Sequence, residues 1–236
     1  MRPLSILFLL LISLSCKENS NKQPDLKKHI EQNVKDSTID KNPVDQPKDT
    51  ITFPVLNDKN AMEFFLQYEK EHKENKVRMT TDFGTVEILL FNETKFHRAN
   101  FIYLTKRKYF NDTQFYRVIN NYIVQAGNSD DMKTSKKRHA IGKYLLPRDT
   151  KRGFKHDRGV LSMPSSDIDN PYKLASPYEF FIVQQTPGAY FLDGDYTIFG
   201  KVTKGMDVID KIAAVDTDDG DWPMKNVYIK NVEIIE

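Results

Sequence analysis

The stretch TQFYRVINNYIVQAGN, residues 113–128, decides the fold. Its two halves, TQFYRVI and NYIVQAG, are rich in the aromatic and β-branched residues that suit a pleated, half-buried surface. Between them stand Asn120 and Asn121, and asparagine favours turns because it tolerates left-handed backbone. The pattern predicts two antiparallel strands joined by a tight turn, with Arg117 in the first strand and Gln125 in the second.

Further strands flank this pair on both sides. Upstream, VRMTTD and TVEILLF read as two strands around a turn at residues 82–84, and downstream the strand signals are GVLSM, EFFIVQQ, YTIFGKV and NVYIKNVEII. Helical spacing appears in HRANFIYLTKR and at 206–214, and a short helix is expected at 58–74, capped by Asn57 or Asp58. Residues 129–158 read as a long basic loop. Many short strands with two distant helices favour a β-barrel with helical caps over alternating βαβ units.

Composition excludes several classes of protein. The 236 residues carry 35 basic and 33 acidic side chains, so the net charge of +2 gives no reason to expect nucleic acid. One cysteine cannot build a disulfide framework or a four-thiolate zinc site. No metal and no cofactor is expected, because the histidines lack metal-ligand spacing and read as surface or helix-end residues. These are His29, His72, His97, His139 and His156. Ser162 lies in no nucleophile elbow.

The N-terminus has the pattern of a targeting signal. Arg2 precedes an apolar run over residues 4–14, and Cys16 stands where cleavage would occur. The segment resembles a bacterial lipoprotein signal, although Ser13 occupies a position where leucine is preferred. Ordinary secretion with a chance cysteine, or a short uncleaved anchor, are the alternatives. We therefore expect a signal peptide at 1–15, a disordered tether at 16–56, a helical extension at 57–76 and a folded domain at 77–236.

The blocks around residues 113–128 resemble the cyclophilins, which are peptidyl-prolyl cis-trans isomerases. FYRVI and YIVQAGN match the core motif of that family, and GVLSM, EFFIV and FLDGDYTIFGKVTKGMDVIDKI follow in the same order and spacing. The resemblance covers about residues 77–236. It implies a mainly β fold, an eight-stranded antiparallel barrel capped by two helices, one over each open end.

The resemblance also implies which residues act. Arg117 matches the catalytic arginine and Gln125 the glutamine that positions it; outside this motif, a strand arginine reads as a solvent-facing ion-pair partner. The substrate-binding pocket would include Tyr122, Ile123, Glu179, Phe181, Leu192 and Tyr196. For the aromatic residues among these, barrel core is the alternative. Independently of the resemblance, isomerisation of an Xaa-Pro bond requires only an apolar pocket for the proline ring and a hydrogen-bond donor that favours the twisted amide.

Three departures from the family pattern bear on activity. Pro164 and Ser165 replace an alanine–asparagine pair, the run at 126–128 departs from glycine–glycine–aspartate, and Glu179 replaces a glutamine. We expect the Glu179 carboxylate to pair with Arg117 or lie beside it, where it would compete with substrate for donors. Otherwise Glu179 points to solvent.

The sequence therefore predicts a monomeric, exported isomerase, anchored to a membrane through Cys16 and facing the periplasm or cell surface. It would act on unfolded or folding proline-containing polypeptides and would not bind nucleic acid. A weakly active or inactive cyclophilin-fold module that binds proline-containing peptides or a fixed partner is the alternative, and an inert spacer is a third possibility. Residues 133–158 hold ten Lys or Arg against two Asp; they read as an exposed loop or as a site for acidic clients or lipid phosphates.

Overall fold

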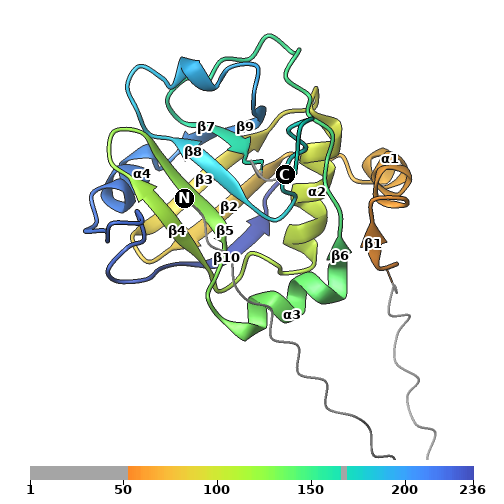
Figure 1. Ribbon diagram of the computed structural model, residues 1–236, viewed down its shortest axis with the longest axis horizontal. Helices are drawn as coiled ribbons and strands as arrows, with labels where there is room; N and C mark the ends of the chain where they lie inside the picture. Colours follow the sequence, from red (N-terminus) through yellow and green to blue (C-terminus); the bar gives the residue numbers. More distant parts are fainter. Residues whose placement is uncertain (1–52, 166–168) are drawn as a thin grey trace, which may run out of the picture. The chain divides into compact units, whose positions relative to one another are not determined.

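Residues 53–165 and 169–236 are described by the computed structural model of the chain (Figure 1). The predicted signal peptide at 1–15, the proposed lipidation site Cys16 and the predicted tether up to residue 52 lie outside the described residues. Within the described part, no helix combines the length and the apolar character that a bilayer crossing requires.

Eight antiparallel strands close into a barrel, which confirms the predicted architecture. Their order around the barrel is β10-β2-β3-β9-β7-β8-β5-β4, and β10 closes it by pairing with both β2 and β4. The strands are β2 (Lys76–Thr81), β3 (Gly84–Leu90), β4 (Thr113–Ile119), β5 (Ile123–Asn128), β7 (Val160–Met163), β8 (Phe180–Val183), β9 (Thr197–Lys204) and β10 (Val227–Ile234). Alternate residues of β2 are buried because successive side chains point to opposite faces. The β4–β5 hairpin turns as predicted, with Asn121 at a φ of 57°.

Two helices lie where the sequence predicts them, α2 (Lys95–Lys106) and α4 (Met206–Ala213). A short 3-10 turn, η1 (Tyr190–Leu192), precedes β9. The barrel core is aromatic: the Phe101 ring stacks on Phe110 at 4.5 Å and meets Phe180 at 5.6 Å. A smaller apolar cluster around Phe181 and Leu192 is separate from this core.

The predicted N-terminal helix is present as α1 (Ala61–Glu71), but neither predicted capping residue begins it. Asn60 is the N-cap residue. The Asn57 carboxamide instead accepts from the Lys59 N–H at 2.9 Å, and the Asp58 carboxylate accepts from the Leu145 N–H at 3.2 Å. Both side chains are thus used in the turn before the helix and in contact with a distant segment.

The predicted tether at 16–56 overlaps packed structure at its C-terminal end. Leu56 belongs to the expected tether, yet it is fully buried in β1 (Leu56–Asn57), which pairs in parallel with β6 (Gly142–Lys143). Gly142 makes this approach possible: it has a φ of 130°, and a Cβ there would lie 1.9 Å from the Leu56 carbonyl oxygen. The composition of the segment could not reveal this pairing, because the partner strand lies far along the chain.

The basic stretch at 129–158 is not all loop, because it contains α3 (Met132–Ile141). Asp131 caps this helix by accepting from the Thr134 N–H at 2.7 Å. Only Thr134 and Ile141 of the helix are buried. The apolar spacing that marks an amphipathic helix is therefore missing, and the cap alone did not suffice to predict it.

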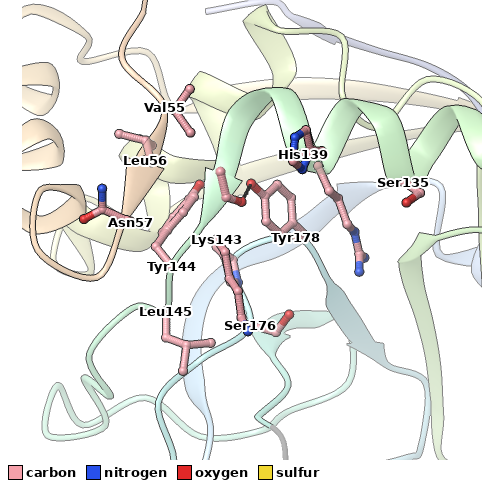
Figure 2. Close-up of a pocket in the computed structure, with 13 residues that line it drawn as sticks. Val55, Leu56, Asn57, Ser135, His139, Lys143, Tyr144, Leu145, Ser176 and Tyr178 are labelled. Atoms are coloured by element: carbon pink, nitrogen blue, oxygen red, sulfur yellow. Dashed lines mark hydrogen bonds between the residues drawn. The ribbon is translucent and has the colours of Figure 1, made fainter. Parts of the chain in front are cut away.

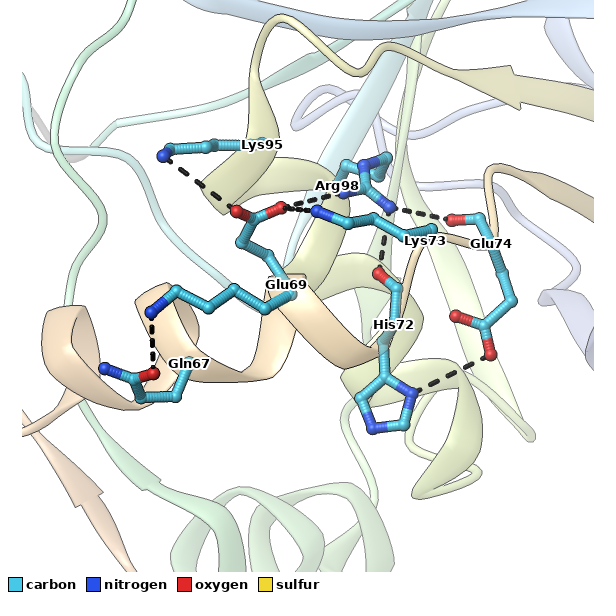
Figure 3. A network of polar contacts seen from close by, with 8 residues as sticks. Gln67, Glu69, His72, Lys73, Glu74, Lys95 and Arg98 are labelled. Carbon is cyan, nitrogen blue, oxygen red and sulfur yellow. Dashed lines mark hydrogen bonds and ion pairs between the residues drawn. The ribbon is translucent and has the colours of Figure 1, made fainter.

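A buried polar network joins α1 to α2 (Figure 3). The Arg98 side chain is 2% exposed and donates to the carbonyls of His72 at 3.0 Å and Glu74 at 3.2 Å. It also pairs with the Glu69 carboxylate at 3.4 Å, which accepts from Lys73 at 2.6 Å. The network ties the helical extension to the barrel domain through both terminal nitrogens of Arg98, whereas its buried Nε has no hydrogen-bond partner among the described residues.

Candidate functional site

The residues predicted to bind substrate meet in one cavity of about 220 Å³. They come from β4, β5, β8 and the segment from η1 to the start of β9, and the predicted Glu179 does not join them. The lining residues are Arg117, Tyr122, Ile123, Gln125, Pro164, Ser165, Phe181, Leu192 and Tyr196. Segments up to about 80 residues apart in the sequence thus build one site, because the barrel places β4, β5 and β8 side by side.

The cavity has an apolar floor that is already packed. Ile123 and Phe181 are each 3% exposed and Leu192 is 7% exposed. The Tyr196 ring meets Phe181 edge-on at 5.7 Å, and Tyr122 lies 5.4 Å from the exposed Phe191. A small ring entering this cavity would gain apolar contact without the cost of rearranging its walls.

Arg117 supplies the charge of the site. It lies in β4 directly opposite Gln125 of β5, and its side chain is 41% exposed. Its Nε donates to the Asp221 carboxylate at 3.3 Å. Within the described residues its terminal nitrogens have no hydrogen-bond partner, so they remain available to a ligand in the cavity.

The sequence analysis did not identify Asp221 as a site residue; it belongs to an acidic run at 216–221. The Asp221 carbonyl accepts from the Val118 N–H at 2.8 Å, which fixes this residue beside β4. The Asp218 carboxylate holds the loop by accepting from the N–H groups of Gly220 and Trp222, both at 2.9 Å. The only sequence signal was the acidic run itself, and nothing in it names Arg117 as the partner.

Gln125 does not hold Arg117 as the resemblance implied. Its carboxamide donates to the Tyr116 hydroxyl, and that hydroxyl donates to the Glu179 carboxylate at 3.0 Å. Burial, followed by the adjacent Glu179 charge, raises the pKa of Tyr116, so its hydroxyl stays protonated and able to donate. Gln125 is therefore held beside the cavity by a tyrosine next to the arginine in sequence.

The expected contact between Glu179 and Arg117 is wrong. Glu179 pairs with Arg138 of α3 at 3.0 Å, and its side chain is only 18% exposed. Arg138 also lies over the Tyr178 ring, 5.2 Å from its centroid, and its Nε donates to the Tyr109 hydroxyl at 2.8 Å. The solvent-facing alternative for Glu179 is excluded as well. Since α3 was not predicted, its cation could not be proposed as the partner.

Two histidines are buried: His97 in the first turn of α2, which agrees with the expected helix-end position, and His156 in the loop before β7, which agrees with neither expected position. His97 is 1% exposed and His156 has no exposed surface. His156 Nδ1 lies 2.8 Å from the Asp193 carboxylate, and its Nε2 lies 3.1 Å from the Ser162 hydroxyl. Ser162 is fully buried and donates to the Thr197 carbonyl at 2.9 Å. The Asp193–His156–Ser162 hydrogen-bond series therefore has no access to a substrate. It supports the cavity floor from below, because the His156 ring stacks 6.1 Å from Phe181.

No group of three or more metal-ligating side chains that could hold a metal ion occurs among residues 53–165 and 169–236. What the cavity offers is an apolar floor, a fixed cation at its edge and free guanidinium donors. Such an arrangement can bind a small apolar ring and donate hydrogen bonds to a polar group attached to it.

Comparison with known proteins matches residues 76–234 to the family model described as cyclophilin type peptidyl-prolyl cis-trans isomerase/CLD. Similar curated proteins include peptidyl-prolyl cis-trans isomerase-like 2 of Rhizopus delemar, 36% identical over 169 residues, which are 71% of this chain and 30% of that protein. Peptidyl-prolyl cis-trans isomerase 4 of Caenorhabditis elegans is 32% identical over 191 residues, 78% of this chain and 35% of its own length. The chain thus spans about a third of the length of these two relatives. An Acinetobacter baylyi peptidyl-prolyl cis-trans isomerase is 34% identical over 143 residues, 60% of this chain and 73% of that protein.

Solved structures agree with the barrel. A Cryptosporidium parvum cyclophilin type peptidyl-prolyl cis-trans isomerase is similar with a TM-score of 0.57 and 26% identity, covering 69% of this chain and 98% of that one. A second structure of that protein was determined in the presence of the dipeptide Ala-Pro; it has a TM-score of 0.57 and 27% identity, and covers 68% of this chain and 99% of that one.

Proposed function

The chain belongs to the cyclophilin-type peptidyl-prolyl cis-trans isomerase family, and from this premise we propose that it catalyses rotation about Xaa-Pro bonds in unfolded or folding polypeptides. One observation carries the proposal. The 220 Å³ cavity joins an apolar floor at Ile123, Phe181 and Leu192 to an arginine whose terminal nitrogens have no partner among the described residues.

The chemistry follows from what an Xaa-Pro bond requires. Rotation crosses a barrier of about 18–20 kcal/mol because it breaks amide resonance, and uncatalysed exchange takes about 10–100 s at 25 °C. In the twisted state the proline nitrogen regains its lone pair. A donor that contacts this nitrogen only in the twisted state lowers the barrier without binding the planar substrate more tightly.

Arg117 is placed to be that donor. The apolar floor holds the pyrrolidine ring, and Asp221 occupies Nε, which leaves the two terminal nitrogens for the substrate. A guanidinium keeps its charge and presents its donors in a rigid fork, so little reorganisation is needed as the amide twists. The remaining wall is formed by Tyr122, Gln125, Pro164, Ser165 and Tyr196. The proposed reaction makes and breaks no covalent bond.

The test is turnover of a short Xaa-Pro peptide, measured by exchange NMR. We expect wild-type protein to accelerate exchange and Arg117→Ala to reduce the rate about 10²-fold or more, the scale of one preorganised donor. Peptide affinity should fall much less, because the apolar floor is intact in the variant. Wild-type protein that binds the peptide without accelerating exchange would instead support the binding-module alternative.

For the whole protein we propose an exported isomerase that is anchored to a membrane through Cys16 and assists folding of exported proteins. The basic start, the apolar run at 4–14 and the position of the lone cysteine support this proposal. Two or more acyl chains hold a protein stably, so wild-type protein should stay with membranes through a salt wash and Cys16→Ser should not. Wild-type protein found wholly in a soluble fraction would contradict the anchor.

A further inference from the structure

The basic stretch at 133–158 separates into two halves of different character. In the second half, four of the five cations are paired with carboxylates. The pairs are Arg148–Asp195, Arg152–Asp149, Lys155–Asp193 and Arg158–Asp210. In the first half, Lys133, Lys136 and Lys143 are exposed, and none of them pairs with a carboxylate of the described residues. The positive charge that remains available therefore lies on α3 and β6.

A cavity of about 610 Å³ has Lys143 in its lining, together with Arg138 and His139 of α3 (Figure 2). Its walls are mainly apolar, formed by Leu56, Tyr144, Leu145, Pro177 and Tyr178, with His139 and Lys143 also in the lining. Val55, at 61%, and Leu145, at 39%, leave apolar surface open to solvent. The site thus combines an apolar interior with a cationic rim.

The walls are fixed by hydrogen bonds that lie away from the opening. The Tyr178 hydroxyl donates to the Gly142 carbonyl at 2.6 Å, and the Tyr144 hydroxyl donates to the Asn100 carboxamide at 2.7 Å. Their polar tips are therefore satisfied, and the rings serve as apolar walls. A preformed cavity of this kind binds without first ordering its own side chains.

The acidic groups nearest to the site are already engaged. Asp58 accepts from the Leu145 N–H, Glu179 pairs with Arg138, and Asp131 caps the start of α3. Asp130 accepts from the Gln114 carboxamide at 3.0 Å. Arg138 contributes little free charge because it is paired with Glu179. The unpaired lysines at the site are therefore Lys143 in the lining and Lys136, which lies one helical turn before His139 on α3.

We propose that this cavity is a second polypeptide-binding site, which holds an acidic segment that carries a bulky apolar side chain. The volume suits one or two large side chains, and the rim attracts Asp or Glu on either side of them. A concave, apolar-walled site fits an inserted side chain better than a flat lipid surface. The inference rests on the proposed function: a client held here presents its prolines to the Arg117 cavity at raised effective concentration.

Fluorescence anisotropy with a labelled, proline-free peptide of alternating Glu-Asp and Phe-Leu pairs tests the proposal. Wild-type protein should bind it, and affinity should fall as salt rises. The double variant Lys136→Glu, Lys143→Glu should bind at least about tenfold more weakly, because two attractive charges become repulsive. The matched control is Lys201→Glu, Lys225→Glu, two other exposed lysines without a carboxylate partner in the described residues; it should bind as wild type does. Turnover of a short Xaa-Pro peptide should be unchanged in both doubles.

Three outcomes would overturn the site. They are no binding by wild-type protein, equal binding by both double variants, and displacement of the acidic peptide by a short Xaa-Pro peptide, which would place it in the Arg117 cavity. A vesicle assay with anionic phosphatidylglycerol separates a membrane role. If the Lys136→Glu, Lys143→Glu variant lost binding to the vesicles and kept binding to the peptide, the cations would be assigned to a membrane instead. Since the acidic peptide contains no proline, failure here leaves the isomerisation assay untouched, and the two proposals fail separately.

Discussion

Arg98 and Arg117 bring the same guanidinium into opposite surroundings. Arg98 is 2% exposed, donates to two carbonyls and pairs with the Glu69 carboxylate. Arg117 is 41% exposed, and its one partner among the described residues is Asp221 at Nε. The Arg98 charge is paired inside the protein, whereas the terminal nitrogens of Arg117 have no hydrogen-bond partner among the described residues. Arg98 therefore stabilises the fold, because its partners belong to the protein, whereas Arg117 can bind a ligand through the nitrogens that have no such partner.

The same contrast separates the two regions around them. In the α1–α2 region aromatic rings pack on one another, with Phe53 edge-on to Tyr103 at 5.2 Å and Phe64 at 5.1 Å from the same ring. The cavity of about 600 Å³ in this region has Phe53, Phe64 and Tyr68 in its lining and no arginine. The Arg117 region keeps a cavity and an exposed Phe191. Changes in the first region should therefore alter stability, and changes in the second should alter turnover. The following predictions can break or sharpen that division.

The largest effect is expected from Arg98→Met. This change removes one partner of a buried ion pair and leaves the carbonyls of His72 and Glu74 without their donor. It should lower the free energy of unfolding by about 3–5 kcal/mol, measured by urea denaturation. Turnover per folded molecule at low temperature should stay at the wild-type level. A large loss of turnover in fully folded Arg98→Met would show that the two regions are not separate.

A fall in pH should lower the free energy of unfolding through His97 of α2 before it lowers turnover at the Arg117 cavity. Burial lowers the pKa of His97 to about 4, and both ring nitrogens lack hydrogen-bond partners in the described part of the chain. Below about pH 6.5 the unfolded chain binds a proton at this residue and the folded chain does not, so stability falls as the pH falls. The loss should be about 2–3 kcal/mol between pH 7 and 4.5.

His97→Phe is the matched control for this pH dependence. It should flatten the decline, although His156 keeps part of it, since burial also lowers the pKa of that histidine. Turnover per folded molecule should not follow the same curve, because His97 is not among the residues that line the Arg117 cavity. An equally steep decline in wild type and His97→Phe would rule out His97 as the cause.

Glu179→Gln tests a residue that contacts Arg138 of α3 and the Tyr116 hydroxyl. The change removes the charge that pairs with Arg138 at 3.0 Å, and it should lower stability by about 1–2 kcal/mol. Turnover should not rise, because Glu179 does not touch Arg117. Asp207→Asn is a control, since its pair with Lys211 is 73% exposed on the carboxylate side and should matter little. A several-fold rise in turnover would instead support the expectation from sequence, in which Glu179 competes with substrate for Arg117.

The smallest effect is expected from Asp221→Asn. Its oxygen can still accept from Arg117 Nε, but the charge that holds the guanidinium is lost. For a half-exposed pair this is worth about 0–1 kcal/mol, so kcat/KM should fall by no more than about fivefold, and Asp221→Ala should fall further. Asp219→Asn, an exposed neighbour, should have no effect. A rise in kcat/KM would mean that Asp221 competes with substrate instead of positioning the arginine.

The sequence predicts the barrel because the relevant signals are local. Alternating apolar residues in the strands and Asn120–Asn121 at the turn predict the hairpin that carries Arg117, and both the eight strands and the cyclophilin family are confirmed. The resemblance to the cyclophilins implied most of the cavity lining, since it matched Tyr122, Phe181 and Leu192 to pocket residues of that family. Periodicity failed for α3, whose exposed, basic surface carries no apolar stripe.

Only the tertiary structure decided which charged and polar groups meet. Arg117 and its partner Asp221 are 104 residues apart, and Arg138 and Glu179 are 41 apart. The family resemblance implied that Gln125 and Glu179 lie beside Arg117, whereas in the structure Gln125 donates to the Tyr116 hydroxyl and Glu179 pairs with Arg138 of α3. Strand periodicity fixes the face on which a side chain emerges. The partner it reaches depends on which loop or helix packs over that face, and a long side chain turns toward the nearest opposite charge that the packing supplies.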